Sequence, residues 1–347
     1  MIGIQQVAGM RRARIKVAAA DGEAVYHVMT RTVNGEFLID DVGKEVLRKQ
    51  LWQVADYCGV EVLTYALLTN HFHVLLRVPH VKEIPTDAEL LRRYAVLYPK
   101  PTQYQTARLE VIKSQLKTNG PEAEAWRKQQ LALMGDVSQF MKLLKQRFSV
   151  WYNKSHQRYG TLWAERFKSV LVEPQGRVIE TMAAYIDLNC VRAGLAADPK
   201  DYRFCGYGEA VGGNAKARAG LQTVRGTLDW ATAQCGYREV LFGTGAFQKP
   251  GQSSIPVEQF KQVLKAGGKL PLATVLRCRV RYFTDGAVLG TQAFVATHLA
   301  TYRLKTGRRQ RAAPRPLPAV TDWGELATLR GLRRDPLGRS STVSHIQ

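Results

Sequence analysis

The sequence has few of the features that mark secreted, zinc-binding or membrane proteins. Its 347 residues include five cysteines, an odd number, and none of them forms a C-x-x-C pair. This pattern predicts neither a disulfide framework nor a zinc site. No apolar stretch reaches the roughly 18 residues of a membrane span, and no long apolar run follows the basic residues of the N-terminus. We therefore expect a cytoplasmic protein in a reducing environment.

Acidic residues are scarce relative to basic ones. The chain has 29 Asp and Glu against 50 Lys and Arg, which gives a net charge of +21. Such a field concentrates polyanions around the molecule, so nucleic acid is the expected partner and a nucleoid-associated location follows. A ribosome-associated protein or a merely solvated basic surface remain alternatives. The hydrophobic content of 45% is ordinary for a buried core.

Apolar periodicity predicts an alternation of strands and helices. We expect strands at 25–32, 60–69, 71–79 and 166–173, with the middle two forming a tight hairpin around Asn70. Helices are expected at 43–57, within 84–153 and at 177–193, and further amphipathic helices at 257–266, 272–279 and 292–304. The order β, α, β, β, α, β, α indicates a mixed α/β fold.

Two histidines on the second hairpin strand are candidate metal ligands. Successive side chains of a strand point to opposite faces, so His71 and His73 project together. Two adjacent imidazoles form half of a metal site. With seven histidines in the chain, an H-x-H pair arises by chance in roughly one such sequence in seven, so a structural role for the pair stays open.

A tyrosine, an amide and a guanidinium share one face of the helix expected at 177–193. Tyr185 and Asn189 are four residues apart, about 40° around the helix axis, and Arg192 lies near the same face. The alternative interpretation is that Tyr185 is a half-buried amphipathic residue and Asn189 a polar residue near the helix end.

Three segments together resemble a known family. They are NHFHVLL at 70–76, GTLWAERFKSVLVE at 160–173 and YIDLNCVRAGL at 185–195. In order and spacing they resemble the single-tyrosine HUH transposases, specifically the REP-associated tyrosine transposases. The resemblance covers residues 26–207, roughly half of the chain. One departure is Cys190, where the family usually has proline, and it puts the end of the helix in doubt.

The resemblance implies an α/β (α+β) fold with a ferredoxin-like antiparallel sheet of the HUH endonuclease type. It also implies that His71, His73 and Asn189 hold a divalent cation, Mg²⁺ or Mn²⁺, and that Tyr185 is the catalytic nucleophile. Attack on single-stranded or hairpin DNA would give a 5′-phosphotyrosine intermediate, and no nucleotide cofactor would be needed for rejoining. The implied protein is a metal-dependent transposase that cuts and joins single strands at hairpin-forming palindromic repeats.

Basic residues outside this set of four are candidate DNA contacts. The residues concerned are Arg31, Arg166, Lys168, Arg192, Arg279, Arg281, Arg308, Arg309 and Arg311. Arg166 and Lys168 would share a strand face by their i, i+2 spacing. Phe283 and Tyr282 lie beside the arginines of 276–286, a combination that suits base stacking. We interpret His27, on the first strand, as a packed or surface histidine rather than a DNA contact.

Composition and pattern divide the chain into four regions. We expect a basic arm at 1–24, the catalytic domain at 25–211 with a helical insertion at 84–153, a helical DNA-binding extension at 212–305, and a basic, disordered tail at 306–347. Whether the protein acts as a monomer or a homodimer is left open by the sequence.

Three other functions compete with the transposase. Histidine-triad hydrolases need a third histidine where this chain has Leu75. A HUH relaxase or replication nickase shares the metal and tyrosine chemistry, although the single tyrosine and short spacing of 185–195 favour a transposase. A domesticated, sequence-specific DNA-binding protein without cutting activity is the third, and the intact trio of His71, His73 and Tyr185 argues against it.

Overall fold

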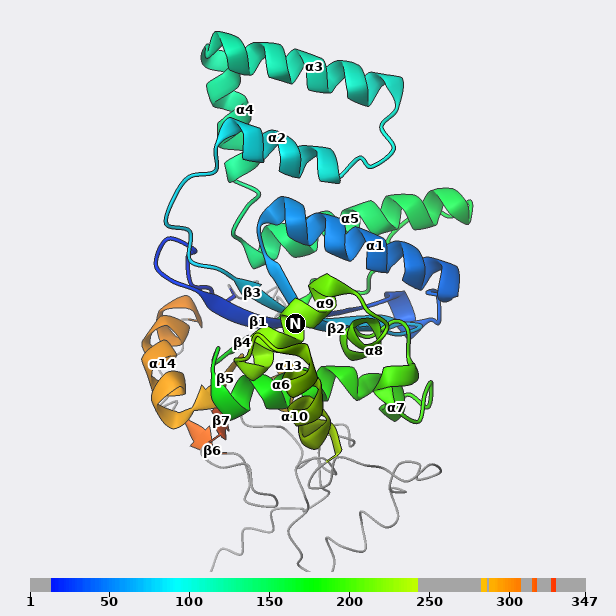
Figure 1. Ribbon diagram of the computed structural model, residues 1–347, viewed down its shortest axis with the longest axis vertical. Helices are drawn as coiled ribbons and strands as arrows, with labels where there is room; N and C mark the ends of the chain where they lie inside the picture. Colours follow the sequence, from blue (N-terminus) through cyan, green and yellow to red (C-terminus); the bar gives the residue numbers. More distant parts are fainter. Residues whose placement is uncertain (1–13, 243–281, 286, 307–313, 317–325, 329–347) are drawn as a thin grey trace, which may run out of the picture.

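The computed structural model describes residues 14–242, 282–285, 287–306, 314–316 and 326–328 (Figure 1). The strands are β1 (Ala24–Arg31), β2 (Glu61–Leu67), β3 (His71–Val78), β4 (Lys168–Val172), β5 (Val288–Thr291), β6 (Arg315–Pro316) and β7 (Leu326–Thr328). The α-helices are α1 (Asp41–Cys58), α2 (Asp87–Val96), α3 (Gln103–Thr118), α4 (Pro121–Leu131), α5 (Val137–Ser155), α6 (Gly176–Asp187), α7 (Asn189–Arg192), α8 (Gly206–Val211), α9 (Ala215–Arg225), α10 (Trp230–Phe242), α13 (Tyr282–Asp285) and α14 (Gln292–Thr306). Two 3₁₀ turns are also present, η1 (Val33–Gly35) and η2 (Pro199–Asp201).

One sheet runs through the molecule, with the strand order β2-β3-β1-β4-β5-β7-β6. The pairs β2–β3, β3–β1 and β1–β4 are antiparallel. Together with α1 and α5 they follow the order β, α, β, β, α, β of a ferredoxin-like unit. The mixed α/β fold expected from the sequence is confirmed, and β3 and β1 are the two inner strands of this unit.

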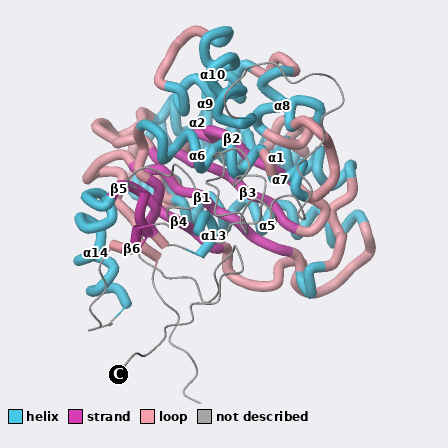
Figure 2. The backbone as a smooth tube through the Cα atoms, turned by 90° about the horizontal axis from the view of Figure 1, so that it is seen from below, coloured by secondary structure: helices cyan, strands magenta, loops and turns pink. Residues whose placement is uncertain are grey.

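Helices cover both faces of the sheet (Figure 1). On one face α1 packs against α5, and both contribute fully buried side chains such as Leu47, Leu51 and Phe148. The opposite face carries α6, α9 and α13, which contact β2, β3, β4 and β1 (Figure 2). Most residues of the inner strands are therefore buried on both faces, which explains apolar runs such as 74–76 of β3.

Local sequence signals account for where the main helices begin and end. The Asp40 carboxylate accepts a hydrogen bond from Gly43 N at the start of α1, and Gly59 ends this helix at φ 64°. Asp136 caps α5 in the same way by accepting from the backbone of Ser138 and Gln139. These caps set the ends of α1 and the start of α5, the two helices that pack on one face of the sheet.

The helical insertion stands apart from the sheet (Figure 1). Helices α2, α3 and α4 enclose a small hydrophobic cluster of their own, built around Leu90, Ile112 and Trp126. The last helix of the segment expected to be helical, α5, belongs to the main core instead. No described helix has the length and apolar character needed to span a bilayer.

The region after residue 212 continues the same core. Leu221 on α9, Tyr237 on α10 and Leu289 on β5 all belong to the main hydrophobic cluster. Helix α9 can lie directly on β2 because Gly220 has no side chain: a Cβ there would meet the carbonyl oxygen of Leu63 at 2.5 Å. The described part of 212–305 therefore shares the hydrophobic core of the domain predicted at 25–211.

Several predicted boundaries differ from those observed. Strands β6 and β7 lie in the segment expected to be a disordered tail. They are ordered here because β7 pairs with β5 and β6 pairs with β7. The predicted strand 166–173 begins only at Lys168, and the predicted helix 177–193 is divided into α6 and α7. The helix predicted at 292–304 corresponds to α14, whereas those at 257–266 and 272–279 lie outside the described residues.

Candidate metal and tyrosine site

Three histidines lie on the sheet face that is covered by α6. His71 and His73 alternate with buried residues along β3, and His27 projects from the neighbouring strand β1. The register places Arg31 opposite His71, and Met29 opposite His73, so His27 is the diagonal neighbour of His73. The ring centroids of His71 and His73 are 5.2 Å apart.

Helix α6 brings Tyr185 against these rings. The centroid of its ring lies 6.0 Å from that of His73 and 6.0 Å from that of His27. Tyr185 is 5% exposed, and Phe283 of α13 covers it with a centroid distance of 4.4 Å. The structure therefore brings the candidate nucleophile together with His73 and His27 in one buried cluster, and the half-buried His71 contacts this cluster through His73.

The other two polar residues of the helix motif lie in α7, the short helix that follows α6. The Asn189 amide donates to the backbone carbonyls of Tyr185 and Ile186, at 3.1 Å in each case. The Arg192 guanidinium also donates to the Tyr185 carbonyl, and its Cζ lies 4.3 Å from the centroid of the tyrosine ring. A cation is therefore held directly beside the phenol by a cation–π contact.

His27 takes part in a hydrogen-bonded chain through the site. Its Nε2 lies 2.8 Å from Nδ1 of His73, and its Nδ1 lies 2.7 Å from the carbonyl oxygen of Phe283. The His27 ring is 1% exposed and stacks on the His73 ring at a centroid distance of 5.1 Å. Of the two environments predicted for His27, packed or at the surface, the structure has the packed one. His27 also contacts His73, a candidate metal ligand.

Burial and positive charge lower the pKa values of the buried histidines. Desolvation lowers the pKa of His27 to about 4, against the opposing effect of the hydrogen bond to Phe283. Desolvation also holds the pKa of His73 well below its usual value, assisted by the neighbouring histidines and by Arg192 and Arg31. Neutral imidazole is the form that binds a metal ion, and the two arginines make the site electropositive.

Two of the expected DNA contacts share this face of the sheet. Lys168, Met29 and His73 lie in one row across β4, β1 and β3, so the exposed Lys168 is on the same face as the histidines. Arg31 is also exposed and lies opposite His71. Two exposed basic side chains therefore lie on the same sheet face as the buried cluster.

The remaining expected contacts have other outcomes. Arg166 is exposed in the loop before β4, so the strand-face argument for pairing it with Lys168 is wrong, because the strand begins only at Lys168. The ring of Phe283 is fully buried on Tyr185, and so it does not present a face for base stacking in this conformation. Arg279, Arg281, Arg308, Arg309 and Arg311 lie outside the described residues.

The donor set fits a divalent cation in part. Within the described ranges, no cluster of three or more His, Cys, Asp or Glu side chains is arranged to hold a metal ion. His71 and His73 supply two imidazoles in contact, and Asn189 would have to supply an amide oxygen as the third protein ligand. Two nitrogens and one oxygen leave coordination positions for a phosphate oxygen and water, as a catalytic site requires.

Asp187 is a buried acid that the sequence analysis left unassigned. Its carboxylate accepts hydrogen bonds from Thr64 on β2, from Tyr207 N on α8 and from the Tyr237 hydroxyl on α10. Desolvation raises its pKa to about 6. Since Asp187 is two residues from Tyr185, these bonds fix the helix that carries the phenol.

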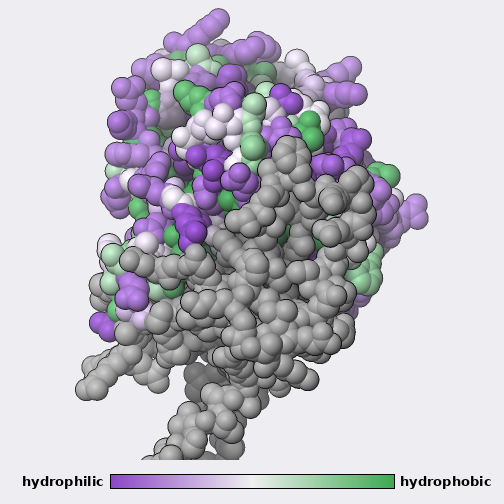
Figure 3. All heavy atoms as spheres, turned by 60° about the horizontal axis from the view of Figure 1, so that its bottom comes forward, coloured by the Kyte–Doolittle hydropathy of each residue, from purple (hydrophilic) through white to green (hydrophobic). Residues whose placement is uncertain are grey.

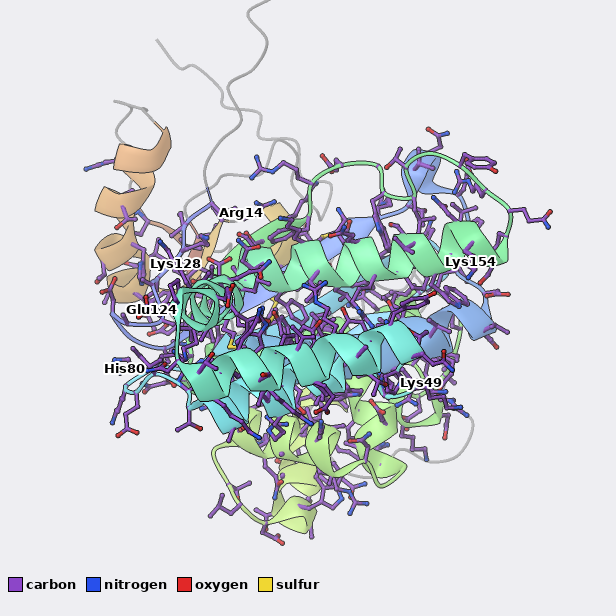
Figure 4. The ribbon with its side chains drawn as sticks, turned by 90° about the horizontal axis from the view of Figure 1, so that it is seen from above. Arg14, Lys49, His80, Glu124, Lys128 and Lys154 are labelled. Atoms are coloured by element: carbon purple, nitrogen blue, oxygen red, sulfur yellow. The ribbon has the colours of Figure 1, made fainter. Side chains whose placement is uncertain are left out.

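Most of the described surface that Figure 3 shows is hydrophilic. Helix α5 lies on the other side of the sheet, and Lys154 is in its last turn (Figure 4). The candidate site is therefore confined to the α6 face, and the basic residues of α5 are remote from it.

The sequence has no match among known families or curated proteins, and its fold has a distant likeness among solved structures. Among the solved structures that match is a REP-associated tyrosine transposase bound to a REP hairpin, with 11% identity and a TM-score of 0.38 over 71% of this chain and 98% of that chain. A TM-score this low does not establish common descent, so the site is interpreted from its own residues.

Proposed function

We propose that the protein is a metal-dependent endonuclease and strand transferase of single-stranded DNA, a transposase that acts at hairpin-forming palindromic repeats. The observation that carries the proposal is the contact between Tyr185 and His73, one of the two paired imidazoles, with ring centroids 6.0 Å apart. A tyrosine side chain from a helix and two histidines from an inner strand are far apart in sequence. Their meeting in one electropositive cluster is what a phosphotyrosine mechanism requires.

In the proposed reaction the Tyr185 oxygen attacks the phosphorus of a DNA phosphodiester. A new P–O bond joins the phenol to the 5′-phosphate, the bond from phosphorus to the 3′-oxygen breaks, and the phenolic proton is transferred to the leaving oxygen or to solvent. The products are a 5′-phosphotyrosine and a free 3′-OH. Because the phosphodiester bond is exchanged rather than hydrolysed, a second 3′-OH can reverse the step and join the strand elsewhere.

The histidine pair would hold the cation that the proposed reaction uses. His71 and His73, with Asn189 as the third ligand, would bind Mg²⁺ or Mn²⁺, which supplies charge neutralisation at a non-bridging phosphate oxygen. Arg192 lies against the phenol ring and is placed to stabilise negative charge that develops on the tyrosine oxygen. Arg31 and Lys168, on the same sheet face, would position the DNA backbone.

A covalent-adduct assay tests this proposal. The protein is incubated with a labelled hairpin-containing single strand and Mn²⁺ and then separated under denaturing conditions. We expect an adduct with the unmodified protein and with Tyr159→Phe, whose tyrosine is 95% exposed, but none with Tyr185→Phe. His71→Ala is expected to lose the adduct while still binding DNA. An undiminished adduct in Tyr185→Phe would reject the proposed nucleophile.

One observation favours a second candidate function. Tyr185 is almost completely buried beneath Phe283, so the described conformation suits a DNA-binding protein that no longer cuts. The same assay separates the two functions: hairpin binding without any adduct, in the presence of Mn²⁺ or Mg²⁺, would support the binding protein.

A further inference from the structure

We infer that His27 is a positioning residue: through its hydrogen bond to His73 it holds that ring in the tautomer whose lone pair is on Nε2. The inference deepens the proposed function, on which its purpose rests, because a metal ligand must present a lone pair. The hydrogen-bonded chain from Phe283 O through His27 to His73 carries the argument.

The first step fixes the proton of His27. Its Nδ1 lies 2.7 Å from the backbone carbonyl oxygen of Phe283. A carbonyl oxygen can only accept a hydrogen bond, so Nδ1 of His27 must carry a hydrogen and donate it. In a neutral imidazole the other nitrogen, Nε2, then has the lone pair.

The second step passes this constraint to His73. Only one hydrogen fits between Nε2 of His27 and Nδ1 of His73, which are 2.8 Å apart. The two rings are 1% and 2% exposed, and burying an imidazolium without a carboxylate partner is costly, so both rings are neutral. His73 therefore donates from Nδ1 to His27, and the lone pair of His73 is on Nε2.

His71 reaches the same tautomer by a separate contact. The side-chain nitrogen of Asn70 donates to the Gly35 carbonyl at 2.9 Å, which turns the amide oxygen toward His71. That oxygen lies 2.6 Å from Nδ1 of His71 and can only accept. In the neutral form of His71 the lone pair is thus also on Nε2, so both histidines of the H-x-H pair present the same nitrogen.

The physical consequence is a ligand pair prepared before the cation arrives. A histidine whose second nitrogen is hydrogen-bonded does not need to exchange tautomers or rotate in order to bind a metal ion. Loss of such a partner typically weakens metal binding about 10- to 100-fold. His27 does not itself offer a nitrogen, since its two nitrogens face His73 and Phe283.

Nitrogen NMR of the metal-free protein tests the tautomers directly. In ¹⁵N-histidine-labelled protein we expect His73 to have a protonated Nδ1 and an unprotonated Nε2. His27→Phe keeps an aromatic ring but removes the acceptor, so the His73 signals should shift toward a mixture of tautomers. A protonated Nε2 on His73 in the unmodified protein would overturn the inference.

Manganese titration, followed by electron paramagnetic resonance, gives the second measurement. We expect the Mn²⁺ affinity to fall about 10- to 100-fold in His27→Phe and to recover in part in His27→Gln, whose amide oxygen can accept from His73. His80→Gln is the matched control, because His80 is exposed at the edge of the molecule (Figure 4). The Mn²⁺ affinity of this variant should equal that of the unmodified protein. Unchanged affinity in a folded His27→Phe would overturn the inference.

Failure of the inference is distinguishable from failure of the proposed function. If the unmodified protein binds no Mn²⁺ and forms no DNA adduct, the proposed function is rejected, while the NMR experiment still decides where the His73 proton lies. If His27→Phe does not fold, the unmodified protein and His27→Gln provide both measurements. If the unmodified protein binds Mn²⁺ normally but His73 has its proton on Nε2, the metal site is supported and the positioning role of His27 is rejected.

Discussion

The hydroxyl of Tyr237 donates a 2.6 Å hydrogen bond to the buried carboxylate of Asp187. This bond ties α10, which follows the expected catalytic domain, to the helix that carries Tyr185 two residues earlier. Thr64 and the backbone of Tyr207 donate to the same carboxylate. The position of the phenol therefore depends on hydrogen-bond donors from three elements, which are the side chains of Thr64 on β2 and Tyr237 on α10 and the backbone of Tyr207 on α8.

Removing the Tyr237 hydroxyl should destabilise the fold. In Tyr237→Phe the ring remains in the core, but the buried Asp187 loses its shortest hydrogen bond. Loss of one partner of a buried charged group costs about 1–3 kcal/mol. Urea denaturation measures the change, with Tyr104→Phe as the control because Tyr104 is 88% exposed. Equal unfolding free energies for the two variants would contradict the role given to Tyr237.

Asp187 should also leave a signature in the pH dependence of stability. Its pKa is raised to about 6 from an ordinary value of 3.8, so between these values the folded protein binds more protons than the unfolded chain. Stability from this group therefore falls as the pH rises through that window, by about 3 kcal/mol at most. The difference between Asp187→Asn and the unmodified protein, measured by denaturation at pH 4 and pH 7, isolates the effect; a difference independent of pH would contradict it.

His27 should act in the opposite direction over an overlapping range. Its pKa is lowered to about 4 from 6.5, so the unfolded chain binds more protons between these values and stability falls as the pH drops from about 6.5 to about 4. His27→Gln should lose less stability than the unmodified protein on acidification through this range. Denaturation midpoints at a series of pH values provide the comparison, and identical acid sensitivity would argue against a neutral buried ring.

Close packing of α9 on β2 predicts a strong effect of a single methyl group. In Gly220→Ala the new Cβ would lie 2.5 Å from the Leu63 carbonyl oxygen and 2.6 Å from that of Val62, both backbone atoms. We expect a loss of about 1–3 kcal/mol from overpacking. Gly120→Ala is the control, since a Cβ there meets nothing within 4 Å. Thermal unfolding measures the stability of both variants. Equal stabilities would show that α9 can shift away from β2 at little cost in free energy.

The basic residues on the site face should contribute to the salt dependence of DNA binding. Arg31→Gln and Lys168→Gln are each expected to weaken binding to single-stranded DNA and to reduce the slope of log affinity against log salt by about 0.7. Lys154→Gln removes an exposed charge on α5, on the other side of the sheet (Figure 4), and should change the slope less. If Lys154→Gln reduced the slope more than Arg31→Gln or Lys168→Gln, the DNA would bind on the α5 face, which would contradict the proposed site.

The parts of the fold that the sequence predicted are those with local signals. The alternation of His71, Phe72 and His73 places the histidines on one strand face, and the apolar periodicity marks α1 and α5. Pairing between distant strands has no such signal. The contact between His27 and His73 depends on the register of β1 against β3, which a single sequence does not reveal.

The later third of the chain was the hardest to predict for the same reason. Strand β7 has only three residues, and it is stabilised by its pairing with β5 rather than by its own pattern. Phe283 was interpreted as a residue for base stacking because it follows several arginines, whereas the structure buries its ring on Tyr185. Basic and aromatic composition predicts a nucleic-acid partner, but not which of the aromatic side chains remain exposed.

The most direct test of the central claim is the identity of the residue that becomes linked to DNA. The protein is reacted with a hairpin-containing single strand and Mn²⁺, the DNA and the protein are digested, and the nucleotide-bearing peptide is sequenced by mass spectrometry. The account predicts a 5′-linked nucleotide on Tyr185, and no such peptide when Mn²⁺ is removed by a chelator. A nucleotide on any other residue, or an adduct that forms equally well without the metal, would contradict it.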